Sequence, residues 1–151
     1  MSHIRIVVAD QAEAIFYDLS SLQARPTEVA RIADPAAHLH DRDFSSDRPG
    51  RSYESFGKAR HAIAGENHPR HREAVKFAKE IAGKLDLDRR NKEFEQLIVV
   101  AGAPFRSLMR TELSADTTAC IVHEVPKDLV HSSVEVLREH LPTTAQELKS
   151  A

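Results

Sequence analysis

The hydrophobic pattern of the first third of the chain predicts three β-strands. Residues 4–9 form a short apolar run rich in β-branched side chains, which is typical of a buried central strand. A tight turn is expected at residues 10–12, and residues 14–19 and 27–32 are predicted as two further strands. Because the three segments follow one another closely, an antiparallel meander is their simplest pairing.

The pattern changes to a helical period at Pro69. This proline suits the first turn of a helix that Asn67 or His68 caps. One apolar stripe follows at helical spacing, formed by Ala74, Ala78, Ile81 and Leu85. Residues 97–101 are a continuous apolar run that ends at Gly102, as expected of a buried strand.

The remainder of the chain predicts a helix, a strand and a second helix. The first helix opens at Pro104, and its apolar side is formed by Phe105, Leu108, Met109 and Leu113. Residues 117–125 are predicted to be a fifth strand. Ser132 and Glu135 form a capping-box pattern for the last helix. The tail from Thr143 either adds one more helical turn or frays.

These elements together predict an α/β fold. The 151 residues are about one domain's worth, so we expect a single domain over residues 1–151. Its centre is predicted to be a mixed five-stranded sheet, a three-strand meander followed by α-β-α-β-α, with a long polar loop before the first helix. Strands joined by helices should pair in parallel. This arrangement resembles the ribonuclease-H-like fold.

Composition and charge exclude several classes of protein. Lys and Arg number 21 against 23 for Asp and Glu, which argues against a strongly basic, whole-surface nucleic-acid binder. The single cysteine excludes a module built on intrachain disulfides. No apolar run approaches the roughly 20 residues of a membrane span, and the run after Arg5 is too short for a signal peptide. We therefore expect a cytoplasmic protein that does not enter the membrane.

The polar segment of residues 34–70 is the strongest candidate for function, because long irregular segments in compact domains are usually functional or disordered. From residue 38 to residue 72 there are seven basic and five acidic residues, with five of the nine histidines. Since arginine grips phosphate with two parallel hydrogen bonds, this stretch is expected to bind RNA or another anion. Alternatively, its arginines and aspartates pair with one another and hold the loop in place. The candidate binding residues are Arg42, Asp43, Asp47, Arg48, Arg51, Tyr53, Arg60, His61 and His71.

Other possible sites have simpler explanations. Asp10 ends the first strand, where ribonuclease-H-like nucleases place an acid that helps bind Mg²⁺, but no acid directly follows the fourth strand. Accepting backbone hydrogen bonds in its own turn is therefore the favoured role of Asp10. Cys120 lies in the predicted fifth strand and is expected to be an inert, buried thiol. Neither a metal nor another cofactor is expected. The most closely spaced histidines do not match the spacing of a zinc site; they are His38, His40, His68 and His71.

Several stretches resemble the bacterial host attachment protein family. The most specific is HDRDFSSDRPGR at residues 40–51, and the resemblance covers nearly the whole chain. The family's fold is similar to the middle domain of archaeal and eukaryotic peptide-chain release factors, which is ribonuclease-H-like. In those factors the loop before the first helix carries Gly-Gly-Gln. The corresponding segment here lacks that tripeptide, so the resemblance does not imply peptidyl-tRNA hydrolysis.

The first functional hypothesis is a binding protein, not an enzyme, whose Arg/His-rich loop contacts RNA on the ribosome or on tRNA. Arg48, Arg51 and Arg60 would hold phosphates, and Tyr53 or Phe56 would stack on a base. The aspartates of the same loop, Asp43 and Asp47, would orient the arginines.

Two further hypotheses belong to other classes. One is a hydrolase that acts on RNA or on a tRNA ester, with Asp10, His61 and His71 as the first residues to test. The other is a protein-interaction module that affects attachment indirectly, as the family name suggests. Turnover would identify the hydrolase, whereas steep salt dependence would identify RNA binding, because phosphate contacts release counterions.

Overall fold

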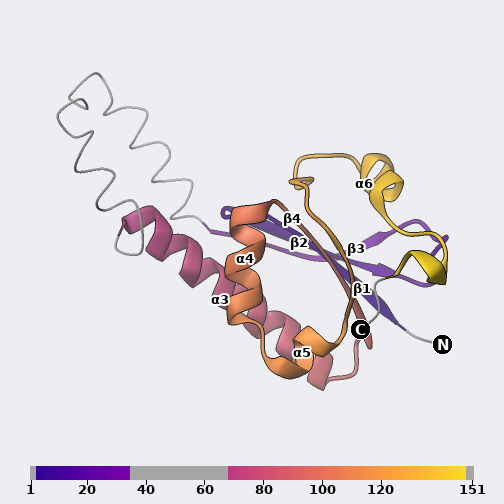
Figure 1. The fold of residues 1–151 in the computed structure, drawn as a ribbon, viewed down its shortest axis with the longest axis horizontal. Helices are drawn as coiled ribbons and strands as arrows, with labels where there is room; N and C mark the ends of the chain where they lie inside the picture. The colour runs from indigo at the N-terminus through magenta and orange to yellow at the C-terminus, as the bar shows by residue number, and fades with distance from the viewer. Residues whose placement is uncertain (1–2, 35–67, 149–151) are drawn as a thin grey trace.

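The computed structural model describes residues 3–34 and 68–148, which form a β-sheet with helices on both faces (Figure 1). This arrangement confirms the α/β class. In chain order the elements are β1 (Ile4–Ala9), β2 (Glu13–Leu19), β3 (Thr27–Ala33), α3 (Pro69–Arg90), β4 (Gln96–Ala101), α4 (Ala103–Glu112), α5 (Ala115–Ala119), β5 (Ile121–Val125), α6 (Val134–His140) and the 3₁₀-helix η1 (Ala145–Glu147).

The sheet is mixed, with the strand order β3-β2-β1-β4-β5. β1 pairs antiparallel with β2, and β2 pairs antiparallel with β3, which confirms the meander. β1 pairs in parallel with β4, and β4 with β5, as expected of strands joined by helices. In the centre, Val8 of β1 lies opposite Ile15 of β2 and Val100 of β4. The carboxyl ends of β1, β4 and β5 therefore meet at one edge of the sheet.

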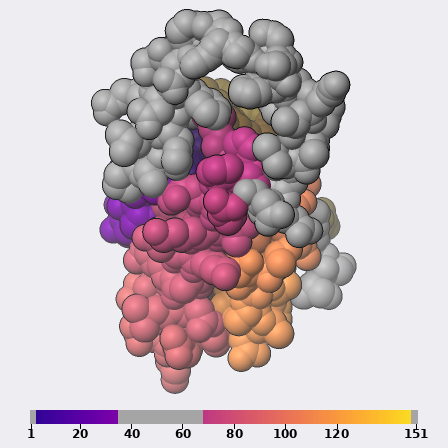
Figure 2. All heavy atoms as spheres, turned by 90° about the vertical axis from the view of Figure 1, so that its left-hand side faces the viewer, coloured from indigo at the N-terminus to yellow at the C-terminus, as the bar shows by residue number. Residues whose placement is uncertain are grey.

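Hydrophobic residues pack on both faces of the sheet. Val7 and Val99 pack with α3 and α4, whereas Val8 and Ile98 pack with α6 and the segment after β5. This division arises because successive side chains of a strand point to opposite faces. In the space-filling view, α3 and α4 lie side by side on one face of the molecule (Figure 2). The predicted stripe of α3 is confirmed, since its four members are buried: Ala74, Ala78, Ile81 and Leu85.

Residues 117–125 do not form one continuous strand, so that prediction is wrong. The short helix α5 occupies Ala115–Ala119, and β5 begins at Ile121. The physical reason is a helix cap, because Ser114 Oγ accepts a hydrogen bond from Thr117 N at 3.1 Å. Cys120 is therefore the C-cap residue of α5 and is half-buried, not enclosed within a strand. Its partial burial raises the pKa of the thiol.

The cap of α6 also differs from the prediction by one residue. Ser133, not Ser132, accepts the capping hydrogen bond, from Val136 N to its Oγ at 3.2 Å. The backbone N of Ser132 instead donates to Leu129 O at 3.1 Å, which places this serine in the turn before the helix. The helical turn expected after Thr143 is present as η1.

Candidate functional site

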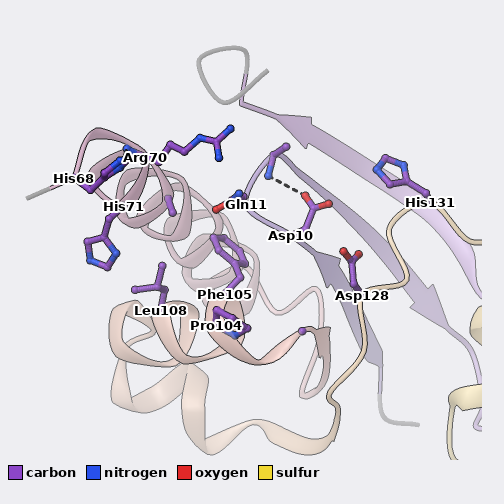
Figure 3. Close-up of a pocket in the computed structure, with 13 residues that line it drawn as sticks. Asp10, Gln11, His68, Arg70, His71, Pro104, Phe105, Leu108, Asp128 and His131 are labelled. Atoms are coloured by element: carbon purple, nitrogen blue, oxygen red, sulfur yellow. Dashed lines mark hydrogen bonds between the residues drawn. The ribbon is translucent and has the colours of Figure 1, made fainter. Parts of the chain in front are cut away.

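A pocket of about 650 Å³ lies at the sheet edge where β1, β4 and β5 end (Figure 3). Four parts of the chain line it: the turn between β1 and β2, the start of α3, the start of α4 and the loop after β5. Its volume is in the range of about 300–1,000 Å³ that small-ligand sites usually have. Ligands of open α/β sheets commonly bind outside the carboxyl ends of the strands. This pocket is therefore the candidate site.

Asp10 places a carboxylate in the pocket directly after β1. Its Oδ1 accepts hydrogen bonds from Ala12 N and Glu13 N, both at 2.8 Å, and its own backbone N donates to Glu13 O at 2.9 Å. These bonds confirm that Asp10 stabilises its turn. They also fix the carboxylate in one orientation, and within the described residues its second oxygen, Oδ2, has no hydrogen-bond partner.

The loop after β5 contributes Asp128 and His131, which sequence reasoning missed. Asp128 Oδ1 accepts a weak hydrogen bond from Val130 N at 3.4 Å. The loop also lies close to the start of α4, since a Cβ added at Gly102 would be 3.9 Å from Asp128 Cβ. These residues could have been predicted from the parallel pairing of β5 with β4, because that pairing places the residues after β5 at the same end of the sheet as Asp10.

The start of α3 lines one side of the pocket with His68, Arg70 and His71, of which Arg70 carries the positive charge. Pro69 occupies the first turn, and His68 Nδ1 accepts a hydrogen bond from Arg70 N at 3.1 Å, which confirms His68 as the cap. The first turn of α3 contains no acidic residue. The dipole of this long helix adds positive partial charge at the same end, so this wall favours an anion.

Apolar side chains form the floor between these walls. Ala74 of α3 and Phe105 of α4 are buried, and Pro104 and Leu108 lie beside them. The ring of Phe105 also packs against Phe77, with the ring centroids 6.1 Å apart, which holds it in place. Because Phe105 is only 7% exposed, the accessible floor is mainly the aliphatic surface of Pro104 and Leu108, with the edge of a fixed ring beneath it.

His71 is the one predicted binding residue that the described part of the chain contains, and it lies in the pocket. The pocket also brings His71 together with Asp10, which is the other described residue of the hydrolase hypothesis. The remaining predicted residues lie outside the described part of the chain: Arg42, Asp43, Asp47, Arg48, Arg51, Tyr53, Arg60 and His61.

The structure does not describe residues 35–67, but the residues on either side of them lie close to the pocket. Before the segment, the backbone N of Asp34 donates to Ala12 O at 2.8 Å, and Ala12 lines the pocket. After the segment, the chain resumes at His68, which also lines the pocket. Asp34 and His68, the described residues on either side of residues 35–67, therefore lie near the same site.

The described residues contain neither a group of metal ligands nor a membrane-spanning helix. Among residues 3–34 and 68–148, no three His, Cys, Asp or Glu side chains are grouped so that they could hold a metal ion. Within the same ranges, no helix is both long enough and apolar enough to cross a membrane.

The fold and the pocket define an α/β protein with a candidate ligand site at the carboxyl edge of its parallel strands. A family model described as "Protein required for attachment to host cells" matches residues 5–141, and the chain belongs to this family. The resemblance found in the sequence is thus confirmed at the level of the family. A search among curated proteins finds no significant match. The family description states a phenotype and names neither a ligand nor a reaction.

Proposed function

We propose that this host attachment family protein is a cytoplasmic RNA-binding protein whose target is the ribosome or tRNA. The location of Asp34 and His68 near the pocket carries this proposal. Arg70 and His71 belong to that stretch and line the pocket, so a bound RNA chain would contact the pocket and the preceding arginines together. Sites for single-stranded nucleic acid usually combine positive side chains along the phosphate backbone with pockets that accept the bases.

The strand order supports the translation machinery as the source of that RNA. An antiparallel meander lies on one side of β1 and two parallel strands lie on the other. This is the arrangement expected of a ribonuclease-H-like fold, the fold that the resemblance in the sequence implies and that it links to the middle domain of release factors. A shared fold does not by itself carry an activity or a partner, so this analogy only suggests the translation machinery and implies no hydrolysis.

In the proposed complex, Arg48, Arg51 and Arg60 grip phosphates through their planar guanidinium groups. Tyr53 stacks on an unpaired base, and His71 contacts the RNA from the wall of the pocket. The carboxylates of Asp43 and Asp47 orient the arginines. Their negative charge also limits how strongly the arginines bind nonspecific RNA.

Co-sedimentation with ribosomes and with free tRNA across a salt titration tests the proposal. Affinity should fall steeply as salt rises, because each phosphate contact releases bound counterions. The variant R48A/R51A should lose most of the binding at moderate salt and show a shallower salt dependence. Its matched control is R25A/R90A, which removes two arginines whose side chains are 65% and 61% exposed, outside the pocket.

The two variants separate a specific RNA surface from a general charge effect. Equal loss in both variants would mean that total charge alone matters, and the proposed surface would be wrong. No binding to ribosomes or tRNA at low salt would reject RNA as the partner and favour the protein-interaction hypothesis.

A hydrolase remains the second candidate because the pocket joins Asp10, His71 and Asp128. A carboxylate and an imidazole in one pocket are the usual groups of general acid–base catalysis. The test is turnover of RNA and of an aminoacyl-tRNA ester by the wild type, D10N, H71A and H61A. Turnover that is lost in these variants while RNA binding persists would support catalysis. Turnover that survives all three substitutions would reject these catalytic assignments.

A further inference from the structure

The pocket has two chemically different walls. His68, Arg70 and His71 lie on the α3 side, whereas Asp10 and Asp128 lie across the pocket, at the end of β1 and on the loop after β5 (Figure 3). A site for a simple anion would gain nothing from two carboxylates, because they repel it. The carboxylate wall therefore indicates that the ligand also presents hydrogen-bond donors.

The carboxylate wall is arranged to accept hydrogen bonds. Two short hydrogen bonds in the turn after β1 hold Oδ1 of Asp10, whereas Asp128 is exposed and its Oδ1 accepts one weak bond from its own loop. Within the described residues, no hydrogen bond uses the second oxygen, Oδ2, of either group. Vicinal hydroxyl groups of a ribose are the kind of donor pair that a carboxylate recognises in nucleotide sites. His131 lies on the same side and adds a ring nitrogen for a polar contact.

The other parts of the pocket match the rest of a ribonucleotide. The cationic start of α3 favours a phosphate, through its side chains and through the positive end of the helix dipole. The floor formed by Phe105, Leu108 and Pro104 offers an apolar surface to a planar base. The volume of about 650 Å³ leaves room for one nucleotide, not for a folded duplex.

We infer that the pocket binds a ribonucleotide with a free vicinal diol, and that in RNA this is the nucleotide at the 3′ end. Its phosphate lies against the start of α3, its ribose hydroxyls donate to Asp10 and Asp128, and its base rests on the floor. This inference rests on the proposed RNA-binding function for the source of the nucleotide, but the recognition chemistry concerns the pocket alone.

Binding of labelled oligonucleotides to the full-length protein tests this inference. The probes are two short oligoadenylates labelled at the 5′ end, one with an ordinary 3′ terminus and one with a 3′-deoxy terminus. Removing one hydroxyl donor to a carboxylate should weaken binding roughly 10- to 100-fold. Adenosine 5′-monophosphate and its 3′-deoxy analogue, used as competitors, distinguish a free nucleotide from an RNA end as the ligand.

D10N and D128N are the informative variants. Asparagine keeps Oδ1 as an acceptor for the turn or loop and replaces Oδ2 by an amide that cannot accept, so the fold is retained while recognition changes. The variant at the carboxylate that receives the 3′ hydroxyl group should bind the two oligonucleotides with nearly equal affinity, whereas the other variant should keep part of the preference. The control D116N alters an exposed carboxylate in the first turn of α5, outside the pocket, and should keep the full preference for the ordinary terminus.

The outcomes separate this inference from the proposed function. Equal affinity of the wild-type protein for both termini would overturn the inference, even if ribosomes and tRNA bind. A preference for the diol that persists in both D10N and D128N would also overturn it. A diol preference seen with adenosine monophosphate alone, without ribosome or tRNA binding, would uphold the pocket chemistry and reject RNA as the source of the ligand.

Discussion

Replacing Arg5 with methionine should lower the free energy of unfolding by about 3–5 kcal/mol, because it leaves a buried carboxylate without its main partner. Arg5 is in β1, and its side chain is 2% exposed. Its guanidinium donates to Asp18 at 2.6 Å and to Asp88 at 2.7 Å, and it lies 3.4 Å from Glu93. The guanidinium carbon is also 5.5 Å from the ring centre of Phe94.

The partners of Arg5 do not contribute equally. Burial by itself would lower the pKa of Arg5, but hydrogen bonds and charge from Asp18 and Asp88 outweigh it and raise that pKa. Asp18 is half-exposed, so water replaces Arg5 there at little cost. Asp88 is 7% exposed and would keep one partner, Lys84, at 3.2 Å. The expected loss of stability therefore comes chiefly from Asp88. Because Lys84 still pairs with Asp88, the loss should lie toward the lower end of the range given above.

Urea denaturation followed by circular dichroism measures this loss by linear extrapolation. The matched control is R31M, since Arg31 also bonds two carboxylates, those of Glu13 and Glu28, but is 47% exposed. Exposed pairs of this kind contribute about 0–1 kcal/mol. The double variant R5M/D88L should recover much of the loss, because apolar residues often replace a buried ion pair without penalty. A loss in R5M no greater than in R31M, or no recovery in the double variant, would refute the reasoning.

Three further changes test the helices, each by urea denaturation. S133A should lose about 1 kcal/mol of stability with the cap of α6, whereas S132A should change it by less than about 0.5 kcal/mol. G83A should gain about 0.5–1 kcal/mol, because an added methyl group meets no atom within 4 Å and glycine disfavours the helix. Hydrogen bonds, the largest from Arg89, lower the pKa of Asp86 in the folded protein. Their stabilisation is therefore complete above the unfolded-state pKa, near 4, and is lost as the pH falls through the lower folded value, so D86N should be less stable than wild type at pH 7 and the difference should shrink as the pH falls below about 4.

Most of the fold could be predicted because its elements have strong local signals. β1 has the same bounds in the structure as in the sequence pattern, since a run of β-branched residues bounded by a turn leaves little choice. The short connections between the first three strands favour hairpin pairing, which the structure has. α5 has no clear signal in the sequence, because five residues are too few to show a helical period and its cap, Ser114, stands alone.

The candidate site was only partly predictable, because its two walls come from different levels of structure. The cationic wall is local: His71 belongs to a basic stretch that is visible in the sequence, so sequence reasoning led to an anion as the ligand. The carboxylate wall arises from topology, since Asp10 and Asp128 come together only when β4 pairs in parallel with both β1 and β5. Adding that wall changes the expected ligand, because two carboxylates disfavour a bare phosphate and favour one that carries hydroxyl donors beside it. A ribonucleotide satisfies both walls, and for that reason the preference for a 3′ hydroxyl group is a stricter test of this site than RNA affinity alone.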